Sequence, residues 1–177
     1  MTDANSNGDN TDNGYNMTSA YNYNLYNQFV SSQDRVENSN VPLTGLKDYM
    51  KQIYRAIAEA ADNKVRLVSA RRWAVDEYGN RVDGNAFVTK NGYYKCINAM
   101  GDILYFKNNN SRHLYGEAID IINTGIDFME LMTDVIMKNP EVLKLMYDYG
   151  VSAFIEQAKD DTGVMTKHYH IGTETIK

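Results

Sequence analysis

The 177-residue chain has few of the residues that would suggest a disulfide scaffold, a membrane protein or a nucleic-acid binder. Its single cysteine, Cys96, excludes an intramolecular disulfide and a cysteine-rich metal site, and we interpret it as a small buried side chain. No stretch approaches the ~18 consecutive apolar residues of a membrane-spanning helix. The formal net charge of -5 argues against a basic surface for nucleic acid or for an anionic membrane.

The N-terminus also lacks the features of a secretory signal. Its first residues, MTDANSNGDN, contain no basic start followed by an apolar stretch. We therefore expect the protein to be made in a cytoplasm without a signal peptide. If it acts outside the cell, another route must deliver it.

The chain divides into two parts by composition. Residues 1–41 are rich in Asn and Tyr and carry too little aliphatic surface to fold alone. They are predicted to form a flexible arm or linker, or an arm whose tyrosines dock on a neighbouring subunit. Residues 42–177 are long enough for one globular domain with a core of its own, in line with the 43% hydrophobic and 23% charged content of the whole chain.

Short helices and strands follow one another irregularly in residues 42–177. Helices are predicted over 44–61, with Thr44 as the cap, over 127–137, and from Pro140 to Gly150, with Asn139 as the cap. Strands are predicted over 65–69, 118–122, 151–155 and 168–171, with a hairpin over 85–97 and a polar loop over 107–112. This pattern favours an α+β domain with a small, mainly antiparallel sheet flanked by helices.

All three histidines lie in two short segments, SRHLYGEAIDI (111–121) and KHYHIGT (167–173). In the first segment, Asp120 stands between isoleucines in a predicted strand, where a carboxylate is costly to bury unless it is paired or bound to a metal. Gly116 allows the chain to turn, so that His113 can fold back over the face from which Asp120 emerges.

In the second segment, His168 and His170 are two residues apart on a predicted strand and project from one face. Their Cα atoms are expected to be about 6.6 Å apart, so one can bind a metal while the other stands at its edge. Two imidazoles and one carboxylate leave a tetrahedral zinc ion with an open position for water. That pattern is typical of catalytic zinc sites rather than structural ones.

These segments resemble motifs of a known peptidase family. SRHLYGEAIDI is similar to the S-x-H-x-x-G-x-A-x-D segment of the D-alanyl-D-alanine carboxypeptidase and L-alanyl-D-glutamate endopeptidase family. This family of zinc peptidases includes many phage endolysins and shares its zinc scaffold with hedgehog signalling domains. Residues 69–72 (SARR) resemble the family's S-G-Y-R motif, and KHYHIGT resembles its closing His-x-His strand. The resemblance runs in order through residues 44–174 and implies a hedgehog/DD-peptidase-like zinc fold.

The resemblance also implies a role for each matching residue. The metal ligands would be His113, Asp120 and His170, and the metal would be zinc. Arg72 would hold a substrate carboxylate or carbonyl, with Arg71 in that role if the alignment shifts by one residue. Ser111 would brace the site, and His168 would stand beside the metal and assist the reaction.

The chain departs from the family pattern at one position. Many members carry an acidic residue three positions before the last ligand, where it serves as general base, but Lys167 stands there in this chain. Either His168 takes the role of the base or catalysis is impaired. Four acidic residues lie nearby in sequence, and their directions do not follow from it: Glu156, Asp160, Asp161 and Glu174.

The leading functional hypothesis is a zinc metallopeptidase that cuts stem peptides or cross-links of bacterial peptidoglycan. A phage-encoded protein of the virion tail or baseplate would explain the missing signal and the Asn/Tyr-rich arm, which could contact other virion subunits. The alternatives are a catalytically impaired virion structural protein that keeps the zinc fold, and a hedgehog-like binding module. Neither nucleic acid nor a membrane is an expected partner.

Overall fold

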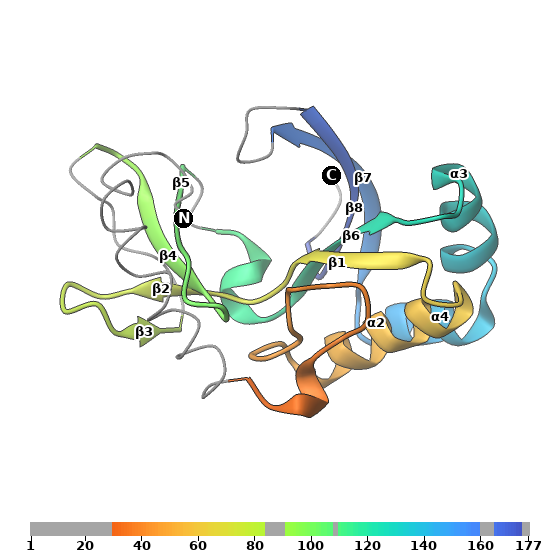
Figure 1. The fold of residues 1–177 in the computed structure, drawn as a ribbon, viewed down its shortest axis with the longest axis horizontal. Coiled ribbons are helices and arrows are strands. Elements are labelled where there is room, and N and C mark those ends of the chain that lie inside the picture. The colour runs from red at the N-terminus through yellow and green to blue at the C-terminus, as the bar shows by residue number, and fades with distance from the viewer. Residues whose placement is uncertain (1–29, 84–90, 108–109, 160–164, 175–177) are drawn as a thin grey trace.

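A computed structural model describes residues 30–83, 91–107, 110–159 and 165–174 (Figure 1). The described chain has an α+β fold with two four-stranded antiparallel sheets, where the sequence predicted one. The first sheet has the order β1 (Val65–Ser69), β6 (Ala118–Asn123), β8 (Met165–Gly172), β7 (Ser152–Lys159). The second has the order β3 (Arg81–Val82), β2 (Arg72–Val75), β4 (Tyr94–Asn98), β5 (Ile103–Phe106).

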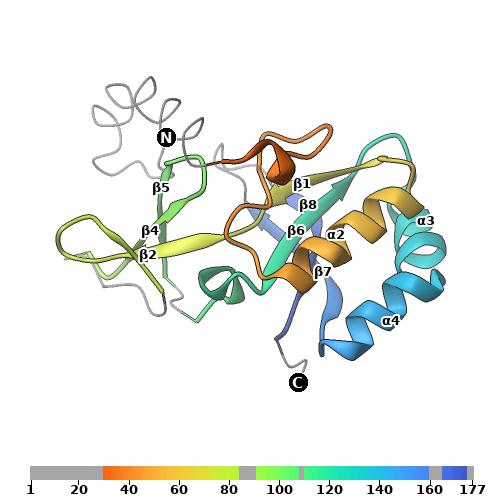
Figure 2. The same ribbon diagram turned by 90° about the horizontal axis from the view of Figure 1, so that it is seen from below.

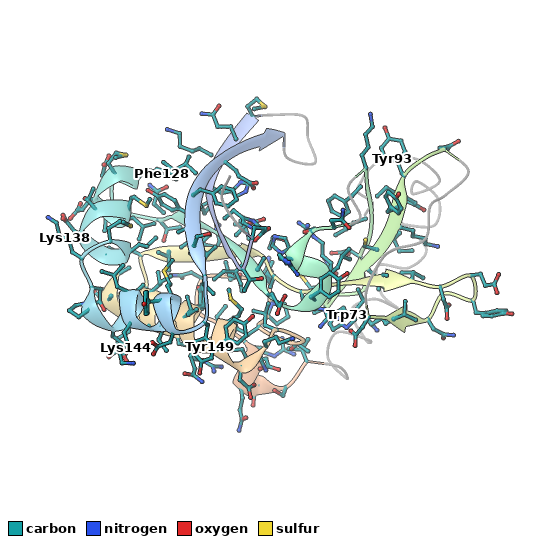
Figure 3. All side chains as sticks on the ribbon, turned by 180° about the vertical axis from the view of Figure 1, so that it is seen from behind. Trp73, Tyr93, Phe128, Lys138, Lys144 and Tyr149 are labelled. Carbon is teal, nitrogen blue, oxygen red and sulfur yellow. The ribbon has the colours of Figure 1, made fainter. Side chains whose placement is uncertain are left out.

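Helices cover one face of the first sheet (Figures 1 and 2). They are α2 (Asp48–Ala60), α3 (Phe128–Glu130), which continues as the π-helical turn η3 (Leu131–Ile136), and α4 (Pro140–Asp148). Two short 3-10 helices, η1 (Ser32–Asp34) and η2 (Arg112–Tyr115), complete the described helical elements. Figure 3 shows Lys138 and Lys144 at the helical end of the molecule, with Trp73 and Tyr93 at the end formed by the second sheet.

The hydrophobic core lies between the first sheet and these helices. Side chains alternate along β6 and β8, so that every second residue enters this core. The residues of the two strands that do so are Ile119, Ile121, Tyr169 and Ile171. The residues between them face the other side of the sheet. The burial of one isoleucine and tyrosine stripe therefore places Asp120, His168 and His170 together on the face that the helices leave uncovered.

Several predicted elements are confirmed. The strand over Val65–Ser69 is present, and α4 begins at Pro140 with the Asn139 side chain accepting hydrogen bonds from two backbone N–H groups. The last two strands are longer than predicted, because β7 and β8 pair along their whole length, from Ser152↔Gly172 to Lys159↔Met165. The predicted helix over 127–137 is present as α3 and η3.

The start of the first long helix differs from the prediction. Thr44 does not cap it, because its hydroxyl donates a hydrogen bond to Asp34 at 3.0 Å and α2 begins at Asp48. The first strand of the hairpin predicted over 85–97 lies outside the described residues. Its second strand corresponds to β4, which pairs with β2 and β5.

Part of the predicted N-terminal arm packs on the domain. Val30 is buried, and Val36 and Val41 pack against the main core. Asp34 forms an ion pair with Lys51 of α2 at 3.0 Å. Residues 1–29, whose tyrosines were predicted to dock on a neighbouring subunit, lie outside the described residues.

Two further sequence expectations concern single features. Cys96 is buried beside Ala74 and Leu114 in a small core of the second sheet, as predicted, and burial raises the pKa of its thiol to about 11. Within the ranges that the structure describes, every helix is too short or too polar to cross a membrane.

Candidate metal centre

His113, Asp120 and His170 lie together, although they come from η2, β6 and β8. One potential ligand atom from each residue lies within 4.8 Å of the others. The Nε2 atom of His113 is 3.3 Å from Asp120 Oδ2, and the Nδ1 atom of His170 is 2.8 Å from Asp120 Oδ1. The three residues are almost fully buried, with 2%, 7% and 4% of their surface exposed. The three ligands expected from the sequence therefore form one compact cluster.

Local structure holds the His113 imidazole in a single orientation. Ser111 caps η2, and its hydroxyl oxygen accepts a hydrogen bond from the backbone N–H of His113 at 3.3 Å. The Nδ1 atom of His113 is 2.6 Å from the carbonyl oxygen of Ala70. Because a carbonyl only accepts hydrogen bonds, Nδ1 carries the proton and the lone pair is on Nε2, which faces Asp120.

Gly116 makes the turn that the sequence predicted. Its φ angle is 73°, in the left-handed region, and it ends η2 immediately before β6. A Cβ atom at this position would meet the carbonyl oxygen of Gly45 at 2.6 Å. Glycine therefore lets the chain reverse closely enough to bring His113 over Asp120.

His170 is directly opposite Asp120 in the β6–β8 pair and lies between two carboxylates. Its Nδ1 atom faces Asp120, and its Nε2 atom is 2.6 Å from Glu174 Oε2. A carboxylate on the far nitrogen of a metal-binding histidine fixes the ring and increases its basicity. Glu174, whose direction did not follow from the sequence, thus supports one of the three candidate ligands.

The burial of this cluster changes the pKa of each member. Burial lowers the pKa of His113, so its lone pair is available at neutral pH. Burial alone raises the pKa of Asp120, but the charges and hydrogen bonds of His113, His170 and Arg72 lower it below its ordinary value. Burial alone lowers the pKa of His170, but its hydrogen bonds with Asp120 and Glu174 raise it to about 10.

The donor set fits a divalent transition metal. Two imidazole nitrogens and a carboxylate oxygen suit zinc, whose ligands in a tetrahedral site stand about 3.3 Å apart for bonds of about 2.0 Å. The separations of 3.3 and 2.8 Å around Asp120 are close to that value. Without a metal, the proton on His170 neutralises part of the carboxylate charge. A cation binding there replaces that proton.

Metal-free protein is expected to lose stability as the pH rises from about 6.5 to about 10. The pKa of His170 is higher in the folded state, so its stabilising effect is complete below about 6.5 and is lost as the pH passes about 10. Urea unfolding in a chelator, compared with His170→Asn, should show a difference on the order of 2 kcal/mol that disappears at high pH. Zinc-loaded protein should show the opposite trend, because protons compete with the metal. A pH-independent difference would contradict the protonation of His170.

The two arginines of the SARR segment lie in different environments. Arg72 on β2 donates a hydrogen bond to Ser69 Oγ at 2.7 Å and lies over the Phe106 ring, and its charge lowers the pKa of Asp120 and His113. Arg71 is buried and donates to the carbonyl oxygen of Gly45 and to Asp83. Arg72 therefore acts electrostatically on the cluster, whereas the hydrogen bonds of Arg71 join segments of the fold.

His168 and Glu156 form a second group beside the cluster. They are opposite each other in the β7–β8 pair, and His168 Nε2 is 3.0 Å from Glu156 Oε2. His168 Nε2 is also 3.7 Å from Asp120 Oδ1. Sequence reasoning did not place Glu156. The signal that could have done so is the two-residue spacing that puts it on one face of a strand with Phe154, which packs against His170. Asp160 and Asp161 lie outside the described residues.

No protein-family model, curated protein or solved structure matches this chain. The structure itself defines an α+β protein with a buried His/Asp cluster able to hold a metal ion. The link to the peptidase family therefore rests on the resemblance of the three sequence motifs.

Proposed function

We propose that the protein is a zinc metallopeptidase that hydrolyses peptide bonds in the stem peptides or cross-links of bacterial peptidoglycan. The observation that carries the proposal is the convergence of His113, Asp120 and His170, whose spacing in sequence resembles the family motifs. Within this proposal the fold is of the hedgehog/DD-peptidase type. The first sheet, which carries Asp120 and His170 on the face away from the helices, is the part that would correspond to the family's zinc-binding sheet.

The residues around the cluster supply the groups that peptide hydrolysis needs. A zinc ion held by His113, Asp120 and His170 would lower the pKa of a water molecule to about 7 and would polarise the scissile carbonyl. Arg72 contributes a positive charge near the cluster and a planar guanidinium that can bind a substrate carboxylate or carbonyl with two hydrogen bonds. His168, at the edge of the cluster, stands where it can assist proton transfer. Ser111 keeps η2 and therefore His113 in place.

The setting is part of the same proposal. The protein would be phage-encoded and mounted on the virion tail or baseplate, from which it would act on the host cell wall. Its Asn/Tyr-rich N-terminal arm, predicted over residues 1–41, would serve as the contact with other virion subunits. Tyrosine suits this role, because it combines a large apolar area with a polar tip.

Digestion of purified sacculi tests the proposed activity. Zinc-loaded protein is expected to release fragments with new amino termini, and chelator-treated protein is expected to release none. The position of the new termini identifies the bond that is cut. If zinc-loaded protein with one equivalent of metal releases no new termini, the peptidase proposal fails and the structural virion protein becomes the better hypothesis.

A further inference from the structure

Glu156 presents a carboxylate to the metal cluster from the neighbouring strand. It lies on β7 opposite His168, and its Oε2 atom is 3.9 Å from His170 Nδ1. Its side chain is 40% exposed, whereas Asp120 and His170 are buried. Glu156 can therefore contact both the buried ligands and a molecule that arrives from solvent.

Glu156 belongs to a second group of possible ligands, with Asp120 and His168, and not to the buried group of His113, Asp120 and His170. Two ligands of one tetrahedral zinc ion stand about 3.3 Å apart. A carboxylate oxygen 3.9 Å from His170 Nδ1 lies slightly beyond that separation. This places Glu156 close enough to the cluster that a water molecule bound there would be able to donate a hydrogen bond to its carboxylate.

The hydrogen bond between His168 and Glu156 determines which of the two can accept a proton. An ionised carboxylate only accepts hydrogen bonds, so His168 Nε2 carries the proton and donates it to Glu156 at 3.0 Å. The ring nitrogen of His168 that faces Glu156 therefore donates and does not accept. Glu156 retains free lone pairs toward the cluster. His168 thus orients the carboxylate, and the carboxylate is the stronger candidate for the base.

We infer that Glu156 is the general base of the reaction and that His168 is a positioning residue. The inference rests on the proposed function. It gives Glu156 the role of the acidic residue that many family members carry three positions before the last ligand, where this chain has Lys167. Glu156 takes one proton from the attacking water, whose oxygen bonds to the scissile carbonyl carbon. The carbon–nitrogen bond then breaks, and Glu156 passes that proton to the leaving nitrogen. The products are a carboxyl group and an amine, and Glu156 is again ionised.

Glu156→Gln tests the inference by separating kcat from KM and from metal binding. It is expected to lower kcat for stem-peptide hydrolysis by about 100-fold to 10,000-fold, with KM unchanged. The variant should still bind one equivalent of zinc, because Glu156 is not a ligand. Glu59→Gln removes an equal charge from an exposed position on α2, across the first sheet, and should change neither quantity. Two equivalents of zinc in the wild type and one in Glu156→Gln would overturn the inference and make Glu156 a ligand of a second cation.

Chemical rescue separates a catalytic carboxylate from a structural one. Glu156→Ala should regain part of its kcat when formate is added, because a small carboxylate can occupy the space of the removed side chain. A purely structural role for Glu156 predicts no response to formate. Failure of rescue together with an unchanged kcat in Glu156→Gln would remove Glu156 from the mechanism.

An activated ester distinguishes failure of this inference from failure of the proposed substrate. Zinc-dependent hydrolysis of 4-nitrophenyl acetate needs a water nucleophile and a base, but no recognition of peptidoglycan. If wild-type protein cuts the ester and not the stem peptide, and Glu156→Gln slows the ester reaction, the substrate class is wrong and the role of Glu156 stands. If both substrates are cut and Glu156→Gln is as fast as wild type, the role of Glu156 is wrong and the peptidase proposal stands.

Discussion

Replacement of His113 by alanine is expected to abolish zinc retention. The variant loses one of three buried ligand atoms, the Nε2 atom that faces Asp120 at 3.3 Å. The loss of affinity should exceed the ~10–100-fold that removal of a supporting residue typically costs, because a ligand itself is removed. Metal analysis after dialysis measures this directly. A full equivalent of zinc in His113→Ala would show that His113 is not a ligand and would contradict the proposed metal centre.

The control for this variant lies in the same 3-10 helix. Arg112→Ala removes a side chain that is 42% exposed and whose ion pair with Glu117, at 3.5 Å, is weak. It should keep its zinc. His113→Ala also removes the hydrogen bond to the carbonyl oxygen of Ala70, so circular dichroism should first establish that the metal-free variant is folded. Zinc loss from a folded His113→Ala variant, with retention in Arg112→Ala, identifies His113 as a ligand.

Replacement of His168 by alanine is expected to keep the metal and to lose turnover. His168 Nε2 is 3.7 Å from Asp120 Oδ1 and 3.0 Å from Glu156 Oε2, so it contacts the site without belonging to the buried set of three. Its loss removes the hydrogen bond that orients Glu156, and kcat should fall by up to about 100-fold, the lower end of what loss of the base itself would cost. Zinc content and steady-state kinetics on one preparation measure both effects.

Two other results would change the role of His168. An unchanged kcat would remove it from the mechanism. Loss of zinc would make it a ligand, because ligand atoms of His168, Asp120 and Glu156 also lie within 4.8 Å of one another. His168→Gln, which can still donate a hydrogen bond to Glu156, should recover part of the activity if His168 acts by positioning the carboxylate.

The candidate ligands were predictable because local rules act on them. Asp120 stands between two buried isoleucines. Because side chains alternate along a strand, its carboxylate must project from the face opposite to theirs. The same rule places His168 and His170 on one face. Gly116, with its positive φ, marks the turn that brings His113 back. These statements need only neighbours in sequence, and the structure bears out the proximity of His113, Asp120 and His170.

The surroundings of the ligands were not predictable in the same way. The positions of Glu156 and Glu174 depend on the register between β7 and β8 and on how the chain leaves β8. Register comes from the sum of many weak contacts across the sheet, which no short motif contains. The second sheet was missed for the same reason, because its strands are short and gain their stability from one another.

The sequence by itself determined which residues of this protein can hold a metal and which face of each strand they leave, since side-chain chemistry and alternation are local. Only the tertiary structure decided that β8 pairs with β6 and so brings His170 beside Asp120 and His113, that Glu174 supports His170, and that Glu156 lies next to them. The physical reason is that His113 and His170, which are 57 residues apart in the sequence, come together only when the core is buried and the strands pair.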